Sequence, residues 1–143
     1  MSDCAAELRK GIIARLKAVT GVTTLLASGA SSVYGAVSQN AAFPYVAVQN
    51  ITAMPFNTKD KLGQEVKFQI HCYSQEKGYE AVDKIAAAVC TALQRQESNI
   101  TVTGYTVVLI DFASRDSFME PSSPATDSFY HAIVIFSGIL QES

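Results

Sequence analysis

Apolar and polar residues follow two different periods along this chain, and each period predicts one kind of element. Over residues 3–19 the apolar side chains recur every three or four positions, which predicts an amphipathic helix. The same spacing over 82–93 predicts a second amphipathic helix that ends near Arg95. A shorter helical fragment is expected at 22–27, before a run of small residues interrupts it.

A two-residue period, or a run of β-branched and aromatic residues, predicts the strands. The clearest case is 65–73, where apolar side chains alternate with polar ones, so that one face belongs to the core and the other faces water or a partner. Val33 opens a short stretch to residue 37 that suits an edge strand. The remaining predicted strands are 45–51, 105–112 and 129–139.

These elements come in the order α-β-β-α-β-β, in runs rather than in strict alternation. That order favours the α+β class: one mostly antiparallel sheet of about four to five strands, with two amphipathic helices packed on one face. The chain has 143 residues and shows no internal repeat or linker, so we expect a single domain over 1–143.

Two polar connections, 52–63 and 113–127, are long for a domain whose other turns are short. Unstructured connections of this length are generally either disordered or functional. They contain large apolar residues, namely Met54, Phe56, Phe118 and Met119. We therefore interpret both segments as contact surfaces that become ordered on assembly, with flexible surface loops in a monomer as the alternative.

Composition then narrows the function. Eleven Lys and Arg against thirteen Asp and Glu give a net charge of -2, without the clustered positive charge of a general nucleic-acid binder. Three cysteines, an odd number, suit a reducing cytoplasm. The start of the chain does not resemble a secretory signal, and the most apolar stretch, 129–140, is too short for a membrane span. We therefore expect no membrane partner.

Catalytic chemistry has little support in the sequence. No phosphate-binding, nucleophile-elbow or zinc-protease motif is present, and we expect no metal and no cofactor. Cys72 and Cys90 fall on apolar stripes and are interpreted as small buried hydrophobic residues. His71 and His131 are expected at the surface or between subunits. A small thiol or hydrolytic enzyme that uses Cys72 or the acids near Asp111 is kept as an alternative.

Acidic residues concentrate in two places. Glu76, Glu80 and Asp83 surround the predicted start of the second helix, where negative charge is favourable against the helix dipole. The other group lies in or beside the second long connection, where charges are normally solvated, and consists of Asp111, Asp116 and Glu120.

Several segments in this order are similar to a known family. They are Val33-Tyr34, Pro44-Tyr45-Val46 and Pro55-Phe56-Asn57-Thr58-Lys59, after an amphipathic first helix. Together they resemble the tail-completion, or tail-terminator, proteins of long-tailed bacteriophages, prophages and gene transfer agents, over nearly the whole chain. The chain departs from that family at 114–127, which is longer and richer in Pro and Ser than the hairpin that members often have.

The resemblance implies a structural virion protein that is assembled in the host cytoplasm and is not an enzyme. It implies a homo-hexameric ring at the head-proximal end of the tail tube, which stops tube polymerisation and joins the tail to the head. The tail tube protein and a connector or stopper protein would be its partners, and DNA would pass through without sequence-specific binding. A head-tail connector or stopper is the alternative. The expected subunit or partner contacts are Met54, Phe56, Thr58, Lys59, Asp60, Lys61, Arg115, Phe118 and Met119.

Overall fold

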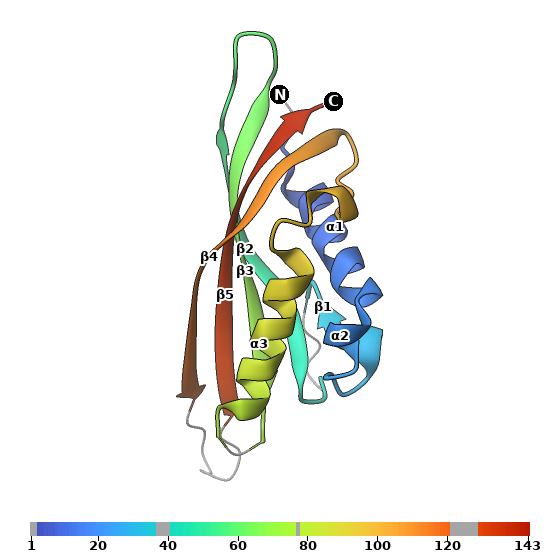
Figure 1. The fold of residues 1–143 in the computed structure, drawn as a ribbon, viewed down its shortest axis with the longest axis vertical. Coiled ribbons are helices and arrows are strands. Elements are labelled where there is room, and N and C mark those ends of the chain that lie inside the picture. Colours follow the sequence, from blue (N-terminus) through green and yellow to red (C-terminus); the bar gives the residue numbers. More distant parts are fainter. Residues whose placement is uncertain (1–2, 37–40, 77, 121–128) are drawn as a thin grey trace.

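The computed structural model describes residues 3–36, 41–76, 78–120 and 129–143. In this part of the chain three α-helices cover one face of a single sheet (Figure 1), which confirms the α+β class. The helices are α1 (Ala5–Ala18), α2 (Thr20–Thr23) and α3 (Glu80–Leu93). The two predicted amphipathic helices correspond to α1 and α3. The third helix, α2, is a single turn and begins slightly before the predicted helical fragment.

The sheet has five strands in the described chain, in the order β1-β2-β3-β5-β4. They are β1 (Val33–Tyr34), β2 (Tyr45–Pro55), β3 (Gly63–Ser74), β4 (Tyr105–Glu120) and β5 (Phe129–Glu142). The short β1 pairs in parallel with β2 at one edge, and every other pairing is antiparallel. The long β4 forms the opposite edge, so β1 and β4 are the two edge strands of the sheet.

The core lies between the sheet and the helices. Leu8, Ile12 and Leu16 from α1 are fully buried, as the helical period predicts. On the sheet side the rings of Phe68 and Phe136 stack with centroids 5.3 Å apart. Apolar residues of α3 complete this layer, namely Val82, Ile85, Ala86, Val89 and Leu93. The helix-covered face is therefore a continuous apolar interior.

The prediction of two long loops is wrong where strands continue into them, whereas residues 56–62 do connect β2 to β3. Residues 52–55 continue β2 and residues 113–120 continue β4, while 121–127 lie outside the described residues. In each strand a register shift interrupts the alternation, between Gln49 and Thr52 and between Phe112 and Ser114. A bulge changes the face on which later side chains lie, and these extensions are mostly exposed. The two-residue period is therefore lost from the sequence although the strands continue.

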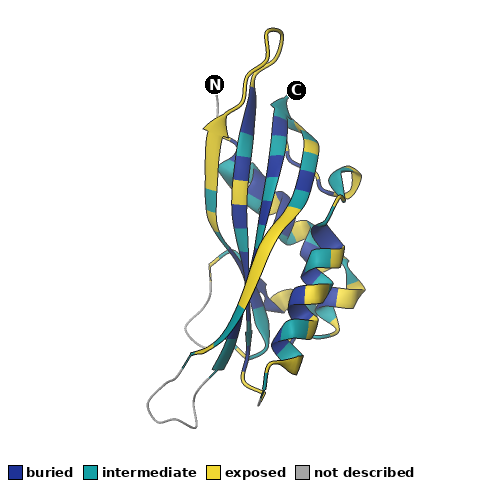
Figure 2. Cartoon of the chain, turned by 60° about the vertical axis from the view of Figure 1, so that its left-hand side comes forward, coloured by how far each residue is buried: buried dark blue, intermediate teal, exposed yellow. Residues whose placement is uncertain are grey.

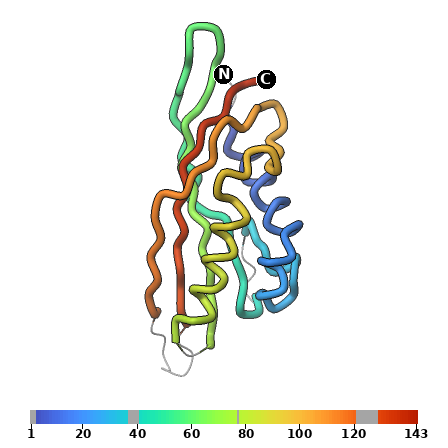
Figure 3. Tube along the Cα trace, in the orientation of Figure 1, coloured from blue at the N-terminus to red at the C-terminus, as the bar shows by residue number. Residues whose placement is uncertain are grey.

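The backbone trace in Figure 3 places the start of α1 and the end of β5 at the same end of the molecule as the hairpin between β2 and β3. Hydrogen bonds hold these segments together, since the Cys4 N–H donates to Oε1 of Gln64 at 3.2 Å and the Glu142 N–H donates to the Leu62 carbonyl at 2.8 Å. None of the helices in the described chain has the length and apolar character that spanning a bilayer requires.

Candidate assembly surfaces

The hairpin between β2 and β3 projects beyond the end of the sheet (Figure 1). We call residues 52–63 the hairpin arm. Every residue from 52 to 62 is exposed, and Figure 2 shows the arm in yellow above the body of the sheet. Six of the predicted contact residues lie on it, so folding brings them together. They are Met54, Phe56, Thr58, Lys59, Asp60 and Lys61.

Local hydrogen bonds give the arm a defined shape. The Phe56 N–H donates to the Gly63 carbonyl at 2.8 Å, and the Thr58 N–H donates to the Lys61 carbonyl at 2.9 Å. The Gly63 N–H donates to Oδ1 of Asn57 at 3.1 Å. A side chain at Gly63 would bring its Cβ within 2.7 Å of the Phe56 carbonyl oxygen, so the close approach requires glycine. The segment is a structured hairpin and not a structureless loop.

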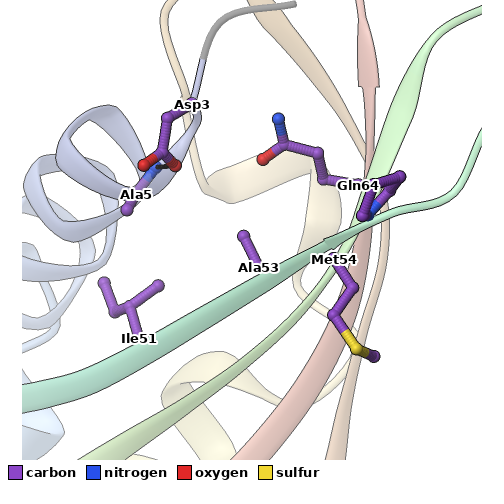
Figure 4. A pocket seen from close by; sticks show the side chains of 7 residues that line it. Asp3, Ala5, Ile51, Ala53, Met54 and Gln64 are labelled. Atoms are coloured by element: carbon purple, nitrogen blue, oxygen red, sulfur yellow. Dashed lines mark hydrogen bonds between the residues drawn. The ribbon is translucent and has the colours of Figure 1, made fainter.

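Large apolar side chains on the arm are exposed to solvent. Met54 is 49% exposed, and Phe56 and Leu62 are exposed to a similar extent. An apolar groove of about 200 Å³ is lined by Phe56 and Leu62 of the arm together with Val108 of β4 and Ile139 of β5. A second groove of about 240 Å³ lies between the start of α1 and β2, with Met54 and Gln64 in its wall (Figure 4). Exposed apolar side chains beside grooves are typical of protein contact surfaces.

The other predicted contact residues lie at the opposite end of the sheet, on the edge strand β4. The first half of this edge is capped within the chain. The Ile110 N–H donates to Oε2 of Glu97 at 3.0 Å, its carbonyl accepts from the Arg95 N–H at 3.0 Å, and the Phe112 N–H donates to Oε1 of Gln94. Beyond Phe112, no other element of the described chain caps the backbone groups of this edge in the same way. We call residues 114–120 the open β4 segment, because such an edge is a template for pairing with another chain.

Arg115, Phe118 and Met119 lie on the open β4 segment in three different settings. The guanidinium of Arg115 forms an ion pair with Asp83 at the start of α3, and Oγ of Ser117 also contacts both groups. Phe118 lies on the face away from the helices, while Met119 is 47% exposed. Of these three residues only Arg115 is already engaged by another element of its own chain through an ion pair.

The face of the sheet away from the helices carries a feature that the sequence analysis missed. His71 and His131 are only 7% and 5% exposed, so the prediction of a surface position is wrong. Aromatic rings on neighbouring strands bury them: Tyr73 stacks on His131 with centroids 4.2 Å apart, and the Phe118 ring lies at 4.8 Å. Cys72, the neighbour of His71, points to the opposite face and is fully buried in the core, as predicted.

Hydrogen bonds join the two histidines to Gln69 on the strand of His71 and to Asn50 and Glu120 on two further strands. His71 Nδ1 lies 2.8 Å from His131 Nε2, and His71 Nε2 lies 2.9 Å from Oε1 of Gln69. His131 Nδ1 lies 3.0 Å from Oε1 of Glu120, and Asn50 Nδ2 donates to Oε1 of Gln69 at 2.9 Å. Burial lowers the pKa of His71, and the neighbouring His131 lowers it further. We call these five residues the histidine chain; it crosses β2, β3, β5 and β4.

The groups considered for catalysis do not form a reactive site. Cys72 is fully buried, so reagents in solution do not reach its thiol. Burial also raises the pKa of this thiol to about 12, so it stays protonated. Cys90 is partly buried against the core. Asp111, Asp116 and Glu120 are spread along β4, opposite Ser137, Ile133 and Phe129 respectively, so they do not converge. Within the described residues no group of three His, Cys, Asp or Glu side chains is placed to hold a metal ion.

The acids at the helix start have a structural role. Glu80 and Asp83 lie in the first turn of α3, where the prediction placed them, and there they face the positive end of the helix dipole. Glu80 also pairs with Lys84 one turn later at 3.1 Å, and Asp83 holds Arg115. These contacts account for the charges without a catalytic role.

Comparison with known proteins places this geometry in a family. A family model described as "Tail completion protein gp17" matches residues 10–140. No curated protein matches the chain. A chain in the solved structure described as "Virion of native gene transfer agent (GTA) particle" has a TM-score of 0.81 and 18% identity, with 99% of each chain covered. At that identity the likeness shows a common fold.

Proposed function

Because the chain belongs to the tail completion protein gp17 family, we propose that it is a tail terminator, which caps the head-proximal end of the tail tube as a ring of six copies. The family is one of structural virion components and not of enzymes, so the thiol or hydrolytic alternative is dropped. The protein is a structural component of the virion tail. In the proposed role it stops polymerisation of the tube protein and offers a surface to a connector or stopper protein.

The observation that carries this proposal is the position of the two candidate surfaces. The hairpin arm extends one end of the sheet, and the open β4 segment lies at the opposite end, on the edge strand. Contacts between two different surfaces of identical chains are heterologous, and they close into a ring when the rotation between copies allows. The arm and the open β4 segment therefore supply subunit, tube and connector contacts in the proposed ring.

The charge of the subunit is consistent with a ring around DNA. A net charge of -2 per copy lets six copies pack without strong mutual repulsion. At the tip of the arm, the two positive charges of Lys59 and Lys61 flank the negative charge of Asp60. A channel without clustered Lys and Arg allows DNA to pass without tight phosphate contacts. We infer that DNA crosses the ring without sequence-specific binding.

A double variant of the arm, Met54→Ser with Phe56→Ser, tests the ring. Both side chains are about half exposed, so the monomer should fold, whereas apolar contacts between copies should be lost. Light scattering of the wild-type protein should give a mass near six times 15.4 kDa, in the presence of tube protein if the tube is needed. The control is Lys10→Ser with Lys17→Ser, which shortens two exposed side chains of α1. Normal assembly of the arm variant would contradict the role given to the arm.

Electron microscopy of particles that lack the gene separates the terminator from the connector or stopper. Tails of uncontrolled length are expected for a missing terminator. Finished tails of normal length that fail to join heads would instead identify a connector or stopper and overturn the terminator proposal.

A further inference from the structure

The histidine chain allows the position of each proton to be deduced from the chemistry of its donors and acceptors. The amide oxygen of Gln69 can only accept, and it already accepts from Asn50 at 2.9 Å. The second partner of that oxygen, Nε2 of His71 at 2.9 Å, must therefore carry a hydrogen. In a neutral imidazole the other nitrogen is then an acceptor.

The second step concerns the contact between the two rings. Nδ1 of His71 lies 2.8 Å from Nε2 of His131, which leaves room for one hydrogen between the two nitrogens. That hydrogen belongs either to Nδ1 of His71, which would then be an imidazolium, or to Nε2 of His131. Burial lowers the pKa of His71, and the carboxylate of Glu120 contacts the ring of His131, so His71 is the neutral ring and Nε2 of His131 is the donor.

The last step reaches Glu120. Nδ1 of His131 lies 3.0 Å from a carboxylate oxygen of Glu120, and an ionised carboxylate only accepts. Since Nε2 of His131 is already protonated, a second ring proton is required for this contact. We propose that His131 is held as an imidazolium between Glu120 and neutral His71, and that this charged hydrogen bond is a latch that fixes the open β4 segment to the sheet.

Glu120 supplies the negative charge beside His131, because the other groups near that ring are neutral or paired elsewhere. Tyr73 of β3 stacks on His131 and Tyr45 of β2 stacks on Tyr73, and both are neutral, because burial raises the pKa of both, to about 12 for Tyr73. Asp116 of β4 lies opposite Ile133, one residue pair further along the same face of β5. Arg115 lies on the helix side, where it pairs with Asp83. Glu120 is therefore the carboxylate in contact with His131 among the described residues.

The latch acts on one of the proposed contact surfaces. The open β4 segment is tied on the helix side by the ion pair of Arg115 with Asp83, and on the outer side by Glu120 with His131. Loss of the His131 proton, or protonation of Glu120, weakens the outer tie, and the strand end that carries Phe118 and Met119 is then held on that side by its pairing with β5. That the latch regulates assembly rests on the proposed function, whereas the protonation of His131 does not.

Nitrogen-15 NMR of the two imidazole rings at neutral pH tests the protonation directly. We expect both nitrogens of His131 to be protonated, and His71 to carry its hydrogen on Nε2. Two neutral rings, each with its hydrogen on Nδ1, would overturn the proposal, because the chain would then run in the opposite direction with the Gln69 amide nitrogen facing His71.

Glu120→Gln and the control Asp116→Asn test the latch. Glu120→Gln should remove one of the two N–H signals of His131, and Asp116→Asn should leave both. In an assembly assay we expect Glu120→Gln to associate about tenfold more weakly, as loss of one charge-assisted hydrogen bond implies. Retained His131 signals in Glu120→Gln would overturn the latch. Normal association with the signal lost would overturn its role in assembly, whereas a wild type that never forms a ring would overturn the proposed function and not the latch.

Discussion

The two faces of the sheet are built from alternating residues of the same strands, yet they are buried in different ways. On the helix-covered face, Phe68, Ile70 and Val134 are fully buried beneath α1 and α3. On the outer face, His71 and His131 are nearly as well buried, although no helix of the described chain covers them. Their cover consists of aromatic side chains from neighbouring strands.

This difference shows that burial has two kinds of requirement. Beneath a second layer, shape and apolar area are sufficient, because every buried side chain there can be hydrocarbon. On a face covered only by its own side chains, polar groups remain beside solvent, and each buried one must find a hydrogen-bond partner. Substitutions should therefore destabilise the protein for different reasons on the two faces.

The largest effect is expected from Phe68→Ala on the covered face. The ring is fully buried and stacks on Phe136, so truncation should cost about 3–5 kcal/mol in the free energy of unfolding through lost apolar burial and a cavity. Urea denaturation measures this cost. Phe118→Ala on the outer face is the control and should cost about 1 kcal/mol, since its ring is partly exposed. Equal costs for the two variants would remove the distinction between the faces.

A smaller effect is expected from His131→Leu on the outer face. The variant places an apolar side chain of similar size at this position and leaves Nδ1 of His71 without its donor. An unsatisfied buried polar group costs about 1–3 kcal/mol, which urea denaturation can resolve. Ile133→Leu, one residue further along the same face of β5, is the control and should cost less than about 1.5 kcal/mol. A neutral or stabilising His131→Leu would mean that apolar packing alone governs this face as well.

Protonation of His71 should make the stability of the protein depend on pH. Because its pKa is lowered in the folded protein from the ordinary value of 6.5, the unfolded chain binds a proton more readily than the folded one. Stability from this group is complete above about pH 6.5 and decreases as the pH falls below that value. Denaturation midpoints between pH 5 and 8 measure the slope. We expect His71→Gln to have a flatter profile than the wild type, and an unchanged slope would exclude His71 as its source.

Thiol labelling should give the smallest effect, with no change in the fold. Cys72 is fully buried with a pKa raised to about 12, so an alkylating reagent at pH 8 should not modify it in the native protein. Cys90, which is partly exposed, should react faster. Mass spectrometry of digested protein locates the label, and labelling in urea shows that all three cysteines are reactive once unfolded. Rapid native labelling of Cys72 would indicate that the covered face opens readily.

The sequence predicted the elements where one face is buried and the period is regular. The helical stripe of α1 and the alternation over 65–73 both appear in the structure. It did not predict the extensions of β2 and β4, because these are mostly exposed and follow the register shifts near Asn50 and Ala113. Asn50 has a φ of 53°, a left-handed conformation that its neighbours in the sequence do not signal.

The contact residues illustrate the same limit. The exposed apolar residues Met54, Phe56 and Met119 were predicted as candidates from their polar surroundings, and the structure finds all three exposed. That they contact a subunit or partner stays a prediction. Arg115 was grouped with them, but its intramolecular ion pair with Asp83 depends on β4 lying beside α3.

The sequence by itself determined the class of fold, the faces of the two long helices and the family, because these depend on local periodicity and on short segments in a fixed order. Only the tertiary structure decided that His71 and His131 meet, since they are separated by 60 residues and are joined by the antiparallel register of β3 with β5. Register is set by pairing across the whole sheet, and neither strand carries it alone. The histidine chain is therefore a property of the assembled sheet.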